Sequence, residues 1–309
     1  MNDTAAPAIW PAIPTEAWGD TKQALARKLQ VVGKLTLSGS AHQNHWWQIQ
    51  LPVSPRGLRT PLLRSGSTLF DVEFDFVQHE VIFTSSGASK RVPLREEPLQ
   101  DFYSAVMGAL GELGIDLPML ARPVEVPDPA TPFAEEDGFS TYDPAAVSWF
   151  WQVIANTERV FDHFGSLFVG KASRPGLFWG GTDFAASRYS GREAPPHPGG
   201  MPNVGLWVMR EGYSHEVAAH GYFADYGTEG AFYAYCYPEP DSYKEQPMPD
   251  GVVWSDEMSE WILPYEVVRT AADPDQRLLE FLQAAYDAAA TALDWDPALK
   301  RDTPIPGHT

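Results

Sequence analysis

Four segments with helical periodicity and recognisable ends divide this chain, and they constrain its fold more than any other feature. Two of them open with an Asp-Pro pair, at Asp143 and Asp273, which places an N-cap residue before a proline at the first helical position. Another follows Pro98, and the first follows Asp20 and stops at Gly33. Apolar residues recur at helical spacing in each. We therefore predict helices over residues 21–32, 99–113, 144–164 and 274–293.

Between these helices the apolar residues recur with a period of two. In residues 70–76, Phe and Val alternate with Asp71, Glu73 and Asp75, which predicts a strand with one apolar and one acidic face. Residues 47–53 alternate in the same way, and residues 85–89 have the composition of a turn. Further strands are predicted at residues 81–84, 177–179, 206–209, 217–223 and 231–237.

The order of these elements is similar in the two parts of the chain. Residues 20–118 and 143–295 each read as helix, strands and helix, and the Pro-rich residues 123–132 between them read as an extended linker. We predict an α+β fold, mainly antiparallel sheet with flanking helices, in which the two halves pack together as one compact unit. Two loosely joined domains are the alternative.

The charge of the chain limits its partners. It has 22 basic and 41 acidic residues among 309, a formal net charge of −19. Such a surface repels nucleic-acid phosphates and anionic membranes, so we expect no nucleic-acid and no membrane partner. A local basic site for a small anion remains compatible with this total charge.

The cysteine content and the N-terminal residues favour a cytoplasmic protein. Cys236 is the single cysteine, which excludes a disulfide within the chain, and it lies in an apolar run typical of a core position. The first residues lack a basic segment followed by an apolar one, and no apolar run approaches the length of a membrane span.

Residues 179–216 concentrate polar side chains in a segment rich in Gly, Ser and Pro, which is typical of loops that hold a site. Arg188 and Arg192 are four residues apart there, and their guanidinium groups suit a carboxylate or phosphate. Arg56 and Arg59 form a weaker candidate pair in the first half. The alternative for each arginine is an ion pair with one of the many acidic side chains.

The histidines of the same segment are candidate acid/base residues. His197 lies in a Pro-rich turn, and His215 is followed by Glu216, while Asp183 or Glu216 could orient a histidine. The spacing from His215 to His220 is one residue longer than the His-Glu-x-x-His of zinc proteases, and on a strand the two would face opposite sides. We therefore predict no metal site, with His197, His215 and Glu216 as the one composite set left open.

Aromatic residues near these polar groups could form the walls of a pocket. Asn44 and His45 precede Trp46 and are candidates to orient a ligand, and their alternative roles are a turn, a cap and core packing. Trp179 and Tyr235 are further wall candidates, and Tyr233, Tyr235 and Tyr237 share one face of their strand.

The sequence lacks the common signatures of several enzyme classes. It has no Gly-x-Ser-x-Gly elbow, no phosphate-binding Gly-x-x-x-x-Gly-Lys-Ser/Thr loop and no Gly-x-Gly-x-x-Gly that opens a helix. These absences argue against the recognisable forms of hydrolases, kinases and dinucleotide enzymes. The cofactor is left unknown by the sequence.

Long motifs in both halves resemble one family. They include Asn-His-Trp-Trp at residues 44–47, Trp-Gly-Gly-Thr-Asp at 179–183, Arg-Tyr-Ser-Gly-Arg at 188–192, Ala-Pro-Pro-His-Pro-Gly-Gly at 194–200 and Tyr-Ser-His-Glu at 213–216. The chain thereby resembles the bacterial domain-of-unknown-function family numbered 5996 (DUF5996) over nearly its whole length. The resemblance implies no activity and no catalytic residue. It does imply that the motifs of both halves belong to one unit, with one site where the halves meet.

These observations leave three hypotheses for the function. The first is a protein that binds, or transforms, a small anionic metabolite in a cleft between the halves, held by Arg188 and Arg192. The second is an interaction module with an acidic surface and no small-molecule site, and the third is a metal-dependent hydrolase. Ligand identity, reaction and oligomeric state are not encoded in any motif that we recognise.

Overall fold

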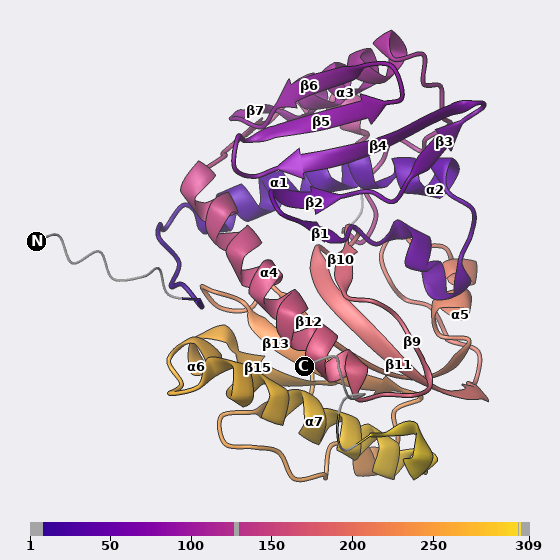
Figure 1. The fold of residues 1–309 in the computed structure, drawn as a ribbon, viewed down its shortest axis with the longest axis vertical. Coiled ribbons are helices and arrows are strands. Elements are labelled where there is room, and N and C mark those ends of the chain that lie inside the picture. The colour runs from indigo at the N-terminus through magenta and orange to yellow at the C-terminus, as the bar shows by residue number, and fades with distance from the viewer. Residues whose placement is uncertain (1–8, 127–129, 302, 304–309) are drawn as a thin grey trace, which may run out of the picture.

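A computed structural model of the chain describes residues 9–126, 130–301 and 303. It has an α+β fold whose sheets are antiparallel, as predicted (Figure 1). The four predicted helices correspond to α1, α3, α4 and α7 below. The helices are α1 (Trp18–Gly33), α2 (Leu35–Gly39), α3 (Leu99–Glu112), α4 (Pro144–Ser166), α5 (Leu206–Gly212), α6 (Tyr265–Arg269) and α7 (Pro274–Ala292), with the 3₁₀ helices η1 (Asn44–Ile49), η2 (Phe133–Glu135), η3 (Asp241–Tyr243) and η4 (Pro297–Leu299).

Two larger sheets and one short strand pair accompany these helices. The strands are β1 (Val53–Ser54), β2 (Gly57–Arg59), β3 (Leu63–Ser65), β4 (Thr68–Asp75), β5 (Glu80–Ser85), β6 (Ser89–Pro93), β7 (Glu97–Pro98), β8 (Phe139–Ser140), β9 (Lys171–Ala172), β10 (Gly176–Phe178), β11 (Asp183–Glu193), β12 (His215–Phe223), β13 (Ala231–Tyr237), β14 (Val253–Ser255) and β15 (Glu260–Pro264).

The Asp-Pro signals act as expected at both helices that carry them. The Asp143 carboxylate accepts the backbone N–H groups of Ala145 and Ala146, and that of Asp273 accepts the N–H of Gln276. The first helix differs from the prediction, because α1 begins at Trp18 and has no side-chain cap. Asp20 is not the N-cap. It lies within the first turn of α1, where its negative charge interacts favourably with the helix dipole.

The first sheet has the order β1-β2-β4-β5-β6, with β3 paired to the other end of β4. The predicted alternation holds in β4, where Phe70, Val72 and Phe74 are buried in the core. Asp71 is only partly buried on the other face, but Asp75 is buried and paired with an arginine. The hairpin strand β6 is absent from our predictions because its Ser-Lys-Arg sequence carries no alternating apolar signal.

The second sheet has the order β10-β11-β12-β13-β15-β14, and β9 pairs with β11. Its longest strand, β11, covers much of the segment that we expected to be a loop. Small and polar residues obscure its period, and pairing with β12 over most of its length stabilises it. The predicted strand 206–209 is wrong, since those residues begin helix α5.

The predicted strand 47–53 is also wrong over most of its length. Residues 44–49 form η1, in which His45 and Trp46 have the positive φ angles of 57° and 63°. Their aromatic rings pack against segments far away in the sequence, and these contacts override the local strand pattern. Only Val53 and Ser54 pair as a strand.

Several contacts join the parts of the chain on either side of residues 123–132. Strand β7 pairs with β8, and Leu51 forms an isolated antiparallel bridge with Leu177. Helix α4 begins near α1 and runs across the second sheet, in contact with α1, β1 and α7 (Figure 1). One cluster of buried side chains contains residues from both regions. Residues 127–129 of the predicted linker lie outside the described residues, and no helix within the described ranges is long and apolar enough to span a membrane.

Candidate functional site

The two faces of the second sheet have different environments. One face packs against α4 and α7, while the other forms the floor of a cavity of about 350 Å³ that we call the acidic cavity. Residues from η1 and from 201–213, including α5, form the remaining walls together with Glu125 and Met258. The polar and aromatic lining residues are His45, Trp46, Trp47, Glu125, Phe178, Asp183, Ser187, Tyr189, Tyr213, Phe223, Tyr233, Tyr235 and Glu260.

Strand alternation places these residues on one face. In β11, Asp183, Ser187 and Tyr189 are separated by even numbers of residues, so their side chains point to the same side. Gly221 provides space for the ring of Tyr233 on the neighbouring strand, because a Cβ there would lie 2.5 Å from the ring. The cavity thus depends on a glycine in the middle of a strand.

Asp183 is the most enclosed carboxyl group of the acidic cavity. Its Oδ2 accepts a hydrogen bond of 2.6 Å from the Tyr233 hydroxyl. Burial raises the pKa of Asp183 although this hydrogen bond acts in the opposite direction. Beside this pair, the hydroxyl oxygens of Tyr213 and Tyr235 are 2.9 Å apart and hydrogen-bonded.

Two glutamates complete a group of three carboxyls. Burial, followed by the negative charge of Asp183, raises the pKa of Glu125 to about 7 and that of Glu260 to about 8. The Glu125 carboxylate lies against Gly180, where a Cβ would come within 2.0 Å of its Oε1. Within the described residues, neither lysine nor arginine lines the cavity to neutralise this group. Burial thus raises the pKa of all three carboxyls, with Glu125 at about 7 and Glu260 at about 8.

Residues with left-handed backbone conformations gather around this group. His45, Trp46 and Glu125 line the cavity with φ angles of 57°, 63° and 55°, and Thr182, next to Asp183, has 61°. Such conformations cost about 1–3 kcal/mol each for a side-chain-bearing residue, and in folded proteins they cluster at binding and catalytic sites. The gathering of four such backbone conformations at this cavity supports a functional role for it.

His45 is held in a defined state at the wall. Its Nδ1 lies 3.0 Å from the Gly212 carbonyl oxygen, and its Nε2 lies 2.8 Å from the Lys171 ammonium. Burial lowers the pKa of His45, so the ring is neutral, donates from Nδ1 to the carbonyl and accepts from Lys171 at Nε2. The ring also stacks on Tyr189 at a centroid distance of 4.1 Å.

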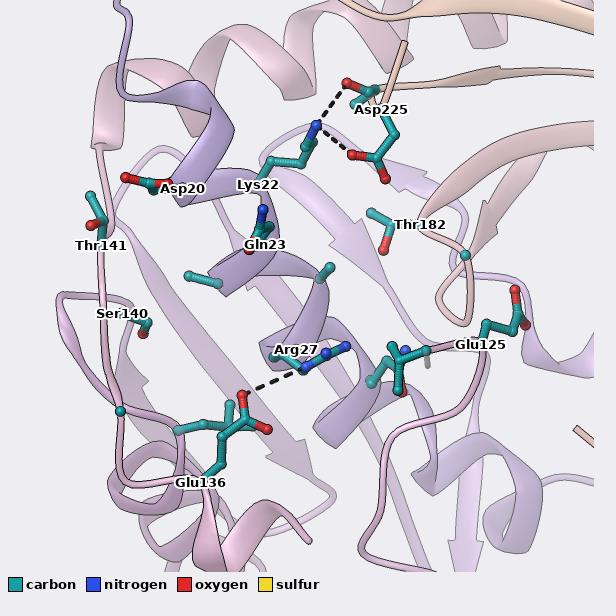
Figure 2. Close-up of a pocket in the computed structure, with 18 of the residues that line it drawn as sticks. Asp20, Lys22, Gln23, Arg27, Glu125, Glu136, Ser140, Thr141, Thr182 and Asp225 are labelled. Carbon is teal, nitrogen blue, oxygen red and sulfur yellow. Dashed lines mark hydrogen bonds and ion pairs between the residues drawn. The ribbon is translucent and has the colours of Figure 1, made fainter. Parts of the chain in front are cut away.

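A second hollow of about 550 Å³ lies on the other side of Glu125. Figure 2 shows Glu125 at its edge, with the carboxylate turned away from the middle of the hollow. The basic side chains here are already engaged: Lys22 pairs with Asp225, and Arg27 lies 3.6 Å from Glu136 (Figure 2). We therefore place the candidate site in the acidic cavity, which has the more enclosed carboxyls.

The structure does not bring the predicted arginines to this cavity. Arg188 is buried on the opposite face of the sheet, and Arg192 pairs with Glu216 and donates to the Leu293 and Asp294 carbonyls at the end of α7. Arg56 pairs with Asp75 and Arg59 with Asp71. Arg56, Arg59 and Arg192 therefore form ion pairs, which was the alternative to ligand binding. Their acidic partners lie 12 or more residues away in the sequence.

The predicted histidine set is also dispersed. His197 stacks on Tyr213 at 4.6 Å, and His215 lies 5.8 Å from the His45 ring, but Glu216 faces the opposite side of β12 and binds Arg192. His215 and His220 face opposite sides of the strand, as predicted. Across the described ranges, no group of three His, Cys, Asp or Glu side chains is arranged to hold a metal ion.

The aromatic predictions are closer to the observed arrangement. His45, Trp46, Tyr235 and Asp183 all line the acidic cavity. Asn44 is exposed, and Trp179 is buried outside the cavity lining, with Lys34 above its ring at 5.5 Å.

Our sequence analysis missed Glu125 and Glu260 as site residues. Glu125 is in the Pro-rich segment and Glu260 in a short strand that we did not predict. The one local signal for Glu260 is its position directly before the apolar run Trp261-Ile262-Leu263.

The sequence model of a family of unknown function, DUF5996, matches residues 10–301. The chain belongs to this family. No curated protein and no solved structure is detectably similar to the chain. For this DUF5996 member, the matched range includes every residue of the acidic cavity, so the whole site lies within the family's common region.

Proposed function

We propose that this DUF5996 member binds a small organic cation, an amine or a quaternary ammonium compound, in the acidic cavity. The carrying observation is a group of three carboxyls, Asp183, Glu125 and Glu260, enclosed among aromatic rings without a lysine or arginine in the described lining. A cation supplies the missing countercharge. A cavity of about 350 Å³ is at the small end of ligand pockets, which suits a metabolite of modest size.

The aromatic walls favour the same ligand chemistry. The rings of Tyr233 and Tyr235 stack with an interplanar angle of 9°, and Tyr213 and Tyr189 add further rings to the lining. Ring faces attract ammonium groups by about 0.5–2 kcal/mol each, more when the cation is desolvated. A neutral ligand of equal shape gains none of this attraction.

Binding is expected to be linked to protons. Because Glu125 and Glu260 have pKa values raised to about 7 and about 8, a bound cation lowers both and releases protons near neutral pH. Affinity for the cation therefore rises with pH across this range. Asp183 and the Tyr233 hydroxyl hydrogen-bonded to it also provide a proton-transfer pair beside the ligand.

A matched ligand pair tests the proposal. Thermal unfolding is measured with choline and with dimethylbutanol, its neutral isostere in which carbon replaces nitrogen, and then with a panel of primary amines and diamines. A ligand present at a hundred times its dissociation constant adds roughly 2.7 kcal/mol of stability. We expect cations to stabilise the protein and their neutral isosteres to have no effect.

Variants then locate the binding. Glu260→Gln keeps the shape of the side chain and is expected to weaken cation binding about tenfold or more. Glu245 is an exposed carboxylate outside the cavity lining, so Glu245→Gln should leave the binding unchanged. The same panel contains acetate, phosphate and dicarboxylates, because the sequence predicts an anionic ligand. Stabilisation by anions alone would overturn the cation proposal, and no response to any ligand would favour the interaction module.

A further inference from the structure

A second, much smaller cavity lies on the helix-packed face of the same sheet. Its volume is about 10 Å³, and Arg188, His220, Phe164, Leu282, Ala285 and Tyr286 line it together with strand alanines. Arg188 pairs across the strands with Ala218, and His220 with Ala186. The two side chains are thus diagonal neighbours on one face, a position from which long side chains reach the same point.

Both polar side chains have nitrogen atoms that point into the protein without a partner. Arg188 is 2% exposed and His220 is 6% exposed. Among the described residues, Arg188 Nε, Arg188 Nη1 and His220 Nε2 are buried without a hydrogen-bond partner. The remaining terminal nitrogen of Arg188, Nη2, donates to the Phe164 carbonyl. The two residues that carry these three nitrogen atoms both line this one cavity.

The surrounding rings stabilise the guanidinium only in part. Phe164, Tyr286 and Phe168 have ring centroids 3.4 Å, 4.7 Å and 5.1 Å from the Arg188 Cζ atom. Ring faces attract the cation from above and below its plane, but the N–H groups of Nε and Nη1 lie in that plane. Asp287 attracts Arg188 at longer range, and its carboxylate binds Lys300.

We propose that Arg188 and His220 hold one monatomic anion, a halide such as chloride, in this cavity between β11, β12, α4 and α7. The size of the cavity sets the ligand class, because a volume of about 10 Å³ admits one water-sized particle and excludes phosphate, sulfate or a carboxylate. A water molecule would accept hydrogen bonds, but only an anion also compensates the buried positive charge.

The protonation of both residues suits this role. Burial, reinforced by the charge of Arg188, lowers the pKa of His220 to about 3, so the imidazole is neutral and its Nε2 can carry a proton to donate. Burial lowers the pKa of Arg188 to about 9, which leaves the guanidinium charged at neutral pH. The site is thus a cation with a neutral donor, and it is independent of the ligand proposed for the acidic cavity.

Urea unfolding in two sodium salts tests the proposal. The protein is dialysed free of halide, and urea unfolding is measured in mixtures in which sodium chloride replaces sodium gluconate at constant ionic strength. Gluconate serves as the reference anion because it is too large for the cavity. We expect the unfolding midpoint to rise with chloride and to remain lower in gluconate. Crystals grown with sodium bromide should show an anomalous peak between Arg188 and His220.

Three variants assign the effect to this cavity. Arg188→Met should abolish the difference between the salts, and His220→Phe, which keeps the ring packed between Phe161 and Phe164, should raise the chloride concentration required by roughly tenfold. Arg59→Met removes a surface arginine and should retain the full difference. If Arg188→Met does not fold, His220→Phe carries the test. Equal midpoints in both salts without a bromide peak, or a chloride effect unchanged in His220→Phe, would overturn the proposal.

Discussion

The two faces of the second sheet bury ionisable groups of opposite kinds, a guanidinium group on one face and carboxyl groups on the other. The face against α4 and α7 buries Arg188, which forms no ion pair with the described carboxylates, whereas the face of the acidic cavity gathers Asp183, Glu125 and Glu260 without a lysine or arginine in its described lining. Strand β11 supplies Arg188 to one face and Asp183 to the other. The backbone of β11 thus separates the guanidinium group of Arg188 from the carboxyl group of Asp183, and the two groups do not pair with each other.

The largest expected effect separates packing from binding. Phe184 is fully buried on the helix-packed face and contacts Phe161, so Phe184→Ala should lower the free energy of unfolding by about 3–5 kcal/mol. Tyr235→Phe, on the cavity face, removes only a hydroxyl and should change stability far less while weakening cation binding. Urea unfolding measures both variants. An equal loss of stability in the two would break the distinction between the faces.

Next in size is the effect of filling the space beneath Tyr233. Gly221→Ala places a methyl group 2.5 Å from the Tyr233 ring, which must move and release its hydrogen bond to Asp183. Overpacking of this kind costs about 1–3 kcal/mol. We expect this loss in urea unfolding, together with loss of cation binding in the thermal-shift assay. Gly87→Ala, in a turn with open space around the added carbon, is the matched control. Unchanged binding in Gly221→Ala would show that Tyr233 does not shape the cavity.

The carboxyls should make the protein less stable as the pH rises. Folding raises the pKa of Glu260 from 4.5 to about 8, so its contribution to stability is full below about pH 4.5 and is lost as the pH rises through about 8. Glu260→Gln should therefore be more stable than the original protein by about 1–2 kcal/mol near pH 9, after allowance for its partial exposure, and equal to it near pH 4. Urea unfolding at several pH values measures this difference, with Glu245→Gln as the control. A pH-independent difference would exclude the enclosed carboxyl as its cause.

The smallest effect concerns the arginine that the sequence assigned to a ligand. Arg192 is half-exposed and joins β11 to Glu216 and to the end of α7. Arg192→Ala should lower stability by about 1 kcal/mol and leave cation binding intact, because the residue does not reach the acidic cavity. Loss of ligand binding without loss of stability would instead support the original assignment to a ligand.

Sequence patterns predicted those elements whose signals are local. Asp143 and Asp273 open helices because a carboxylate can satisfy backbone N–H groups two or three residues away in any surrounding. Strand β11 was missed because its residues, from Asp183 to Glu193, include Ala, Ser and Gly that carry little period-two signal. Its stability comes from pairing with β12, some 30 residues away in the sequence.

Of the residues that line the acidic cavity, the sequence analysis named some of the aromatic and polar ones but not the two glutamates. His45, Trp46, Asp183 and Tyr235 were recognised because aromatic and polar residues alternate there within short motifs. Glu125 and Glu260 come from segments far from these motifs in the sequence, and no spacing rule relates them to Asp183. The acidic character of the cavity lining is therefore a property of the assembled fold.

By itself, the sequence determined the α+β class, four helices and the apolar face of strands with clear alternation such as β4, because these follow from the short periods of helices and strands. The tertiary structure alone decided which arginines find acidic partners, that His45 and Trp46 adopt a left-handed turn, and that three carboxyls meet among aromatic rings. The physical reason is range: backbone geometry acts over a few residues, whereas burial and charge pairing depend on neighbours that only folding brings together.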